Sequence, residues 1–128
     1  MSDTGFAFIN KTRKRISSSH FKSIKETVLT NKYTLSVVVV SKGVSRQLNR
    51  KYRKKDKPTN VLSFPLSKNE GEIFLDADTI QKETKKFDRN FDNLLTFLFI
   101  HGLFHLKGFK HGVTMERRET AIRRKFKI

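Results

Sequence analysis

The chain has 128 residues, a length typical of one compact domain, and its hydrophobic residues, 36% of the total and including 12 phenylalanines, can fill one core. Lysine and arginine number 28 against 12 acidic residues, so the formal net charge is +16 and nucleic acid is the first class of partner to consider. The absence of cysteine excludes disulfides and thiolate metal sites, and it fits a reducing cytosol.

Nothing in the sequence predicts a membrane protein. Met1 to Asn10 contains an acidic residue and no long apolar run, so it does not resemble a secretory signal. The longest apolar stretch, Leu94 to Leu106, has about 13 residues with two histidines among them, which is too short and too polar to span a bilayer. We therefore expect a cytoplasmic protein with no membrane partner.

The first half of the chain predicts two strands and two helices. Gly5 to Ile9 is consistent with a short strand, and His20 to Leu29 with a helix that a serine cluster precedes. Thr34 to Val40 ends in four valines, a β-branched run that predicts a strand buried on both faces. Val44 to Arg53 predicts a helix with basic residues on one side. Its other side is apolar and consists of Val44, Leu48 and Tyr52.

The middle of the chain begins with a turn. Pro58 restricts the backbone within Asp56 to Asn60, and a strand from Val61 to Phe64 should follow. Pro65 lacks a backbone donor, so this strand should end there or lie at a sheet edge. Another short strand is expected at Glu72 to Leu75, followed by a helix over Asp76 to Lys86.

A long helix from Asp88 to Lys107 is apolar almost all round between Leu94 and Ile100, which predicts a central position in the core. Gly108 is well placed to end it, and Thr114 to Lys127 predicts a basic terminal helix. Strands and helices mixed in this order indicate an α+β or α/β fold with a small sheet in one domain.

Three of the four histidines lie within eleven residues, and their spacing predicts a metal site. His101 and His105 are four residues apart and so project from the same side of the long helix. Gly108 can adopt a positive φ, which lets the chain turn back and bring His111 to the same ion. Three imidazoles leave one position open, as in catalytic zinc sites. His20 is far from these three histidines in the sequence, and we assign it no role.

The spacing H-x-x-x-H-x-x-G-x-x-H is also that of the metzincin proteases, which carry a glutamate directly after the first histidine. That position is Gly102 here. Without this proton acceptor we do not expect a protease, although a carboxylate supplied from elsewhere would reopen that reading.

The segment H-G-L-F-H-L-K-G-F-K-H from His101 to His111 resembles the signature H-G-x-L-H-L-x-G-Y-D-H of the YbeY family of rRNA maturation factors. A second segment, L-N-R-K-Y-R-K-K-D-K-P-T-N-V-L-S-F-P from Leu48 to Pro65, resembles the family's L-N-x-x-Y-R-x-K-D-x-P-T-D/N-V-L-S-F-P. Gly71 to Ile73 resembles its G-D-I strand, and the resemblance extends roughly from Thr34 to Glu119.

The resemblance implies an α+β domain over residues 1–128, with a small mixed sheet of about four strands, about five helices and a central metal-binding helix. It implies a zinc-dependent, single-strand-specific endoribonuclease that acts in late 16S rRNA 3′-end maturation and in small-subunit and 70S ribosome quality control. The partners it implies are rRNA and the small ribosomal subunit; DNA is not expected.

Carried over residue by residue, the resemblance makes His101, His105 and His111 the ligands of one Zn²⁺ ion, which a water completes, and makes Arg53 the functional arginine. A guanidinium also suits a phosphate on physical grounds, and the turn at Pro58 can fold Arg53 towards the metal. The chain departs from the signature most at the residue before the third histidine, where lysine replaces aspartate. The candidate RNA-binding residues are Arg50, Lys54, Lys55 and Lys110.

The general base is left open, because no aspartate or glutamate stands beside the histidines in the sequence. Either the water on the metal or the 2′-hydroxyl of the RNA can supply the attacking oxygen. Ser63 and Asn60 are candidates to line the cleft. A non-enzymatic, RNA-binding ribosome assembly factor with a structural metal site is the alternative from another class of function.

Overall fold

A mixed sheet organises the chain, whose computed structural model describes residues 5–128. In this part of the chain four strands are present, β1 (Phe6–Asn10), β2 (Thr34–Val40), β3 (Val61–Ser67) and β4 (Glu70–Asp76). Their order in the sheet is β1-β2-β4-β3. β1 and β4 both pair with β2 in parallel, and β3 pairs with β4 in antiparallel orientation. The predicted small mixed sheet is therefore confirmed.

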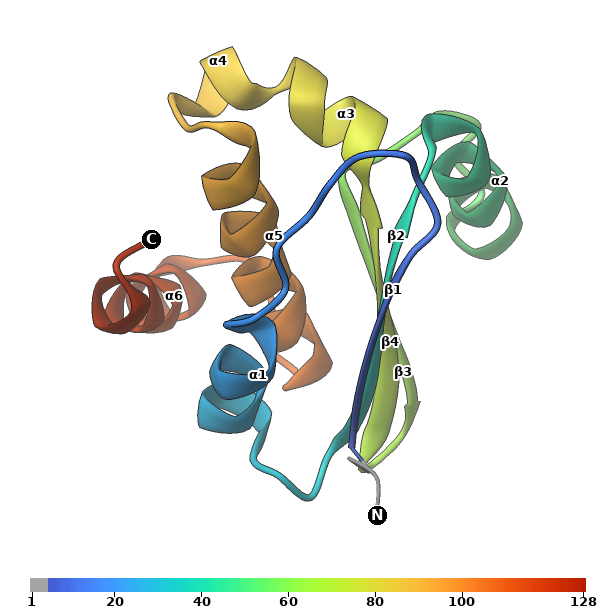
Figure 1. Ribbon diagram of the computed structural model, residues 1–128. Coiled ribbons are helices and arrows are strands. Elements are labelled where there is room, and N and C mark those ends of the chain that lie inside the picture. Colours follow the sequence, from blue (N-terminus) through green and yellow to red (C-terminus); the bar gives the residue numbers. More distant parts are fainter. Residues whose placement is uncertain (1–4) are drawn as a thin grey trace.

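Helices cover both faces of this sheet (Figure 1). α1 (Phe21–Leu29) and α5 (Phe91–Leu106) lie on one face, and α6 (Val113–Phe126) lies outside α5. α2 (Lys42–Arg53) lies on the other face. Within residues 5–128, no helix combines the length and the apolar character that crossing a membrane requires.

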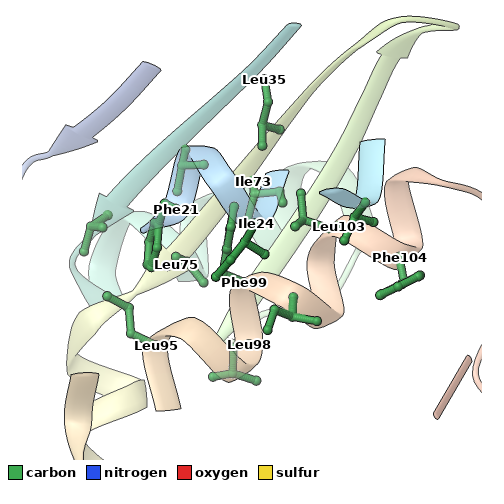
Figure 2. Packing of buried hydrophobic residues seen from close by; sticks show 14 of the residues in the cluster. Phe21, Ile24, Leu35, Ile73, Leu75, Leu95, Leu98, Phe99, Leu103 and Phe104 are labelled. Atoms are coloured by element: carbon green, nitrogen blue, oxygen red, sulfur yellow. The ribbon is translucent and has the colours of Figure 1, made fainter. Parts of the chain in front are cut away.

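The core lies between the sheet and the pair formed by α1 and α5 (Figure 2). Phe99 of α5 stacks on Phe21 of α1, with ring centroids 4.5 Å apart and planes 10° from parallel. Ile73 and Leu75 of β4 face the same cluster, and both are fully buried. The nearly continuous apolar surface of α5 thus follows from its position between the sheet, α1 and α6.

The valine-rich strand β2 is buried on both faces, as predicted. Val37 and Val39 belong to the core beneath α1 and α5. Val38 and Val40 alternate with them and therefore face the side of α2, where they too are buried. β2 is also an interior strand of the sheet, between β1 and β4.

The strand that contains Pro65 is the edge strand β3, as its missing backbone donor suggested. The strand does not end at the proline, however, and it continues to Ser67. A register shift between Pro65 and Ser67 accommodates the proline in the pairing with β4. The hairpin to β4 follows directly.

Six helices are present in the described chain rather than about five, because the predicted helix over residues 76–86 is divided. α3 (Ala77–Lys82) and α4 (Thr84–Phe87) are separated at Glu83. The long helix also starts later than Asp88, which has a positive φ of 53°. Its N-cap is Asn90, whose side chain accepts a hydrogen bond from the amide of Asn93. For α1, the residue at the N-cap is His20 rather than a serine, and its side chain makes no capping bond.

The predicted apolar residues of α2 are not the buried ones, because Val44 and Tyr52 are exposed and Leu48 is half-buried. The buried residues of this helix are Ser45 and Asn49. Ser45 exchanges hydrogen bonds with the backbone of Thr59, and the Asn49 amide donates to the carbonyl of Lys57. These bonds fasten the loop between α2 and β3 to the helix, which places the residues that end α2 beside β3.

Candidate metal centre

The last two turns of α5 carry two of the three predicted metal ligands. His101 and His105 are one turn apart, and their rings meet with centroids 4.5 Å apart. The helix ends at Leu106, and Gly108 follows with a φ of 100°, a conformation that favours glycine. The chain then turns back and brings the ring of His111 to 4.6 Å from that of His105. Gly108 ends the helix as the sequence predicted.

The nitrogen atoms of the three rings converge. One ligand atom from each histidine lies within 4.8 Å of the other two, and the Nε2 atoms of His101 and His105 are 3.1 Å apart. A tetrahedral ion with bonds of about 2.0–2.1 Å requires a nitrogen separation of roughly 3.3 Å. The three side chains therefore fit one ion with small adjustments.

The hydrogen bonds of the outer ring nitrogens support the same conclusion. Nδ1 of His101 lies 2.9 Å from Oε2 of Glu119, and Nδ1 of His105 lies 3.2 Å from the carbonyl oxygen of Phe109. Both partners accept hydrogen bonds, so both Nδ1 atoms carry the proton in neutral rings. Two Nε2 lone pairs then face each other at 3.1 Å. A cation between them turns this repulsion into attraction.

Glu119 is a site residue that the sequence did not reveal. It lies on α6, is only 4% exposed, and its other carboxylate oxygen is 3.6 Å from the guanidinium of Arg123. No aspartate or glutamate stands beside the histidines in the sequence, but the fold places the Glu119 carboxylate next to His101. A signal was present, because Glu119 interrupts an apolar stripe at helical spacing. The other members of that stripe are Met115, Ile122 and Phe126.

The pKa of His105 is lowered, first by burial and then by the nearby rings of His101 and His111. The hydrogen bond to the carbonyl of Phe109 and the charge of Glu119 oppose this shift. A neutral imidazole is the form that binds a metal, so the lowered pKa favours binding at neutral pH.

The histidines line a cleft of about 970 Å³. α5 and α6 form one wall, which includes Glu119, and β3 and the end of α2 form the other, which includes Arg53. The guanidinium of Arg53 lies 5.1 Å from the centre of the Phe64 ring, and its Nη2 donates to the carbonyl oxygen of Ser63 at 2.8 Å. The fold therefore brings Arg53 to the cleft that the histidines line.

Two further expectations concern the lining of the cleft. Ser63 and Asn60 both line it, as suggested. Both also have structural partners, since the Ser63 hydroxyl donates to the carbonyl of Gly102 and the Asn60 amide donates to Glu83. Both residues therefore line the cleft and also stabilise the fold.

The candidate RNA-binding residues are all exposed, but they do not share one place. Lys55 lines the cleft, whereas Arg50, Lys54 and Lys110 are not among its lining residues. Lys54 is the C-cap of α2, with a φ of 58°. The sequence did not single out several other lining residues, namely Lys57, Phe87, Phe97 and Glu116.

Gly102, the residue that separates this chain from the metzincin pattern, is buried against the sheet. A Cβ atom at this position would lie 2.9 Å from the Ser63 hydroxyl and 3.2 Å from the Ile73 side chain. A glutamate does not fit there without displacing β3 or α5. His20 is also separate from the histidine group, because its Nε2 pairs with the hydroxyl of Thr96 at 2.9 Å.

Comparison with known proteins identifies the family. The family model described as "Endoribonuclease YbeY" matches residues 6–127. The chain belongs to the YbeY family. An "Endoribonuclease YbeY" from Aliarcobacter butzleri is 36% identical over 110 residues, which cover 81% of this chain and 77% of that protein. The family resemblance inferred from the two motifs is thus confirmed.

Other YbeY relatives are matched over a smaller share of their length. A protein from Chelativorans sp. is 38% identical over 95 residues, 67% of this chain and 58% of the relative. The solution structure of a Thermotoga maritima protein has a TM-score of 0.63, with 91% of this chain and 85% of that chain aligned at 24% identity. This structure supports the α+β fold described above.

Proposed function

We propose that this chain is a zinc-dependent endoribonuclease that cleaves single-stranded RNA in the cleft between α5, α6 and β3. The observation that carries the proposal is the convergence of three imidazoles in a cleft that Arg53 also lines, in a member of the YbeY family. Both the ligand role of the histidines and the phosphate role of Arg53 belong to this proposal.

The ligands in the proposal are His101, His105 and His111, and zinc suits three nitrogen donors without any thiolate. A zinc ion held there supplies Lewis acidity towards a phosphoryl oxygen and lowers the pKa of a bound water. Glu119 and the carbonyl of Phe109 hold the rings of His101 and His105 with Nε2 directed inwards.

Arg53 acts on the phosphate in this scheme. Within residues 5–128, the guanidinium makes one hydrogen bond to the protein, the donation from Nη2 to the carbonyl of Ser63, and its other N–H groups suit phosphate oxygens. Negative charge develops on those oxygens as the phosphodiester is cleaved, and a fixed guanidinium stabilises it. Lys55 and Lys57 line the same cleft and attract the RNA backbone.

The open shape of the site favours a catalytic over a structural metal. His111 is exposed, and the ligand group lies on the wall of a cleft rather than inside the core. Structural zinc sites fill all four positions with protein ligands, whereas only three candidate ligands meet in the described part of this chain. The non-enzymatic assembly factor is therefore the second candidate.

We place the substrate at the 3′ end of small-subunit ribosomal RNA, with the small subunit as partner and the cytoplasm as compartment. The net charge of +16 supports an RNA partner, and the choice of rRNA rests on the family resemblance.

The test is cleavage of a labelled RNA that spans an rRNA 3′ end, together with elemental analysis of bound metal. His105→Ala should lose both metal and cleavage, while His20→Ala, which removes the histidine outside the group, should retain both. A metal-depleted, folded His105→Ala variant that cleaves as fast as the wild type would refute the catalytic metal. Wild-type protein that binds zinc and RNA without cleavage would favour the assembly factor.

A further inference from the structure

Three aromatic side chains form a row on the face of β3 that points away from the cleft. Tyr52 of α2 contacts Phe64 of β3 edge to face at 5.3 Å, and Phe64 contacts Phe74 of β4 at 5.8 Å. Tyr52 is 55% exposed. Phe64 and Phe74 are half-buried, and Phe64 contacts the tyrosine ring, which remains partly open to solvent.

The row adjoins the candidate active site through a shared residue. The guanidinium of Arg53, which lines the cleft, lies 5.1 Å from the centre of the Phe64 ring that also contacts Tyr52. Ser63 and Pro65, the neighbours of Phe64 in β3, line the cleft from the opposite side of the strand. Arg53 and the exposed ring of Tyr52 therefore contact the same Phe64 ring at the edge strand β3.

Basic side chains lie at the Tyr52 end of the row, and one acidic side chain lies beside its middle ring. At the Tyr52 end, the ammonium of Lys51 lies 5.2 Å from the centre of the tyrosine ring, and the exposed side chains nearby on α2 are basic. Glu72 of β4 is paired with Phe64, the middle ring of the row, and lies on the same face of the sheet. A polyanion is therefore attracted to the Tyr52 end of the row and repelled beside Phe64.

We propose that Tyr52 is a base-stacking residue for the single-stranded RNA segment that leaves the cleft over the edge of β3 beside Arg53. Aromatic rings between cations are the usual platform for single-stranded nucleic acid, because every base has a face that stacks and the cations hold the phosphates. The proposal rests on the RNA-cleaving function above, and it assigns a second contact outside the metal cleft.

The same surface also contains another exposed apolar residue, which provides a control variant for the experiment. Val44, two turns before Tyr52 on the same side of α2, is 40% exposed but lacks an aromatic ring. A protein partner bound to this side of α2 would contact both residues. RNA stacking requires only Tyr52, so Val44→Ala is the matched control for Tyr52→Ala.

The experiment measures binding of zinc-loaded protein to a short 2′-O-methyl oligouridylate by fluorescence anisotropy. Tyr52→Ala should weaken binding roughly 5- to 100-fold, whereas Tyr52→Phe and Val44→Ala should bind as the wild type does. Zinc content and thermal unfolding of each variant report on the fold.

The intrinsic fluorescence supplies a second readout, because the chain has no tryptophan and two tyrosines. Tyr33 is 6% exposed, so bound RNA should quench the Tyr52 component of the emission, and Tyr52→Phe should abolish this quenching. Unchanged affinity in a folded Tyr52→Ala variant, or equal losses in Tyr52→Ala and Val44→Ala, would overturn the stacking proposal. If one of these results is found and the wild type still cleaves RNA, the stacking proposal fails and the proposed function stands. A wild type that neither binds nor cleaves RNA would refute both the stacking proposal and the proposed function.

Discussion

The carboxylate of Glu119 accepts a hydrogen bond from Nδ1 of His101 at 2.9 Å, across the interface of α5 and α6. The carboxylate is buried, and Arg123 lies 3.6 Å from its other oxygen. Carboxylates bonded to the outer nitrogen of a metal-ligating histidine fix the ring and increase its basicity. Through Glu119, the terminal helix α6 therefore positions a side chain of the candidate metal centre.

This relationship predicts that Glu119→Gln weakens zinc binding about 10- to 100-fold, because glutamine lacks the charge that polarises His101. The matched control is Glu116→Gln, one turn earlier on α6, which changes the net charge equally at a side chain that is 69% exposed. Competition with a zinc chelator measures both affinities. Equal affinities of the two variants would remove Glu119 from the metal centre.

Packing at Gly102 predicts opposite effects of two glycine substitutions. A Cβ at Gly102 meets Ser63 and Ile73 at 2.9 and 3.2 Å, so Gly102→Ala should destabilise the fold by about 1–3 kcal/mol. A Cβ at Gly43, in the first turn of α2, meets only the hydroxyl of Ser41 at 3.9 Å. Gly43→Ala should therefore stabilise by about 0.4–1 kcal/mol. Denaturant unfolding measures both changes, and a Gly102→Ala variant as stable as the wild type would contradict the close packing of α5 on β3.

Arg53 should affect turnover rather than metal binding. Arg53→Ala and Arg53→Lys are expected to lower the cleavage rate roughly 100- to 1,000-fold and to retain zinc, since lysine cannot reproduce the planar donor fork. Arg50→Ala, an exposed change on the same helix and away from the cleft, should weaken RNA binding with little effect on turnover at saturating RNA. Loss of zinc in Arg53→Ala would show that the arginine supports the fold of the site instead.

His20 predicts a pH dependence of stability. Burial lowers its pKa below the ordinary value of 6.5, and the charge of Asp92 opposes this shift only in part. The unfolded chain then binds more protons than the folded chain as the pH falls below about 6.5, so this contribution to stability is present above that pH and lost below it. Thermal unfolding of the wild type should lose more stability on acidification than that of His20→Gln. Parallel pH profiles of stability in the two proteins would contradict the lowered pKa of His20. Any contribution of His105 is the same in both proteins and cancels in the comparison.

Local features of this fold were predictable from the sequence because neighbouring residues determine them. Four consecutive valines identified the interior strand β2, and the helical spacing of His101 and His105 placed both on one side of α5. Gly108 indicated the reversal that brings His111 to them. Each of these signals lies within about ten residues, where backbone geometry connects sequence to space.

Features that depend on tertiary packing were not predictable in the same way. Glu119 reaches His101 only because α6 packs on α5, and an interrupted apolar stripe was a weak sign of this in the sequence. The buried residues of α2 are Ser45 and Asn49 because their side chains bond to the following loop, a tertiary contact that the apolar pattern of the helix did not indicate. The break at Glu83 between α3 and α4 likewise had no clear marker in the chain.

Removal and return of zinc test the central claim most directly. One preparation is depleted by a chelator, checked for its fold by circular dichroism, and assayed for cleavage of single-stranded RNA before and after addition of one equivalent of zinc. Cleavage should disappear on depletion and return with the metal, while His105→Ala should not recover. A depleted, folded protein that cleaves RNA at the rate of the zinc-loaded one would contradict the assignment of the three histidines to a catalytic metal.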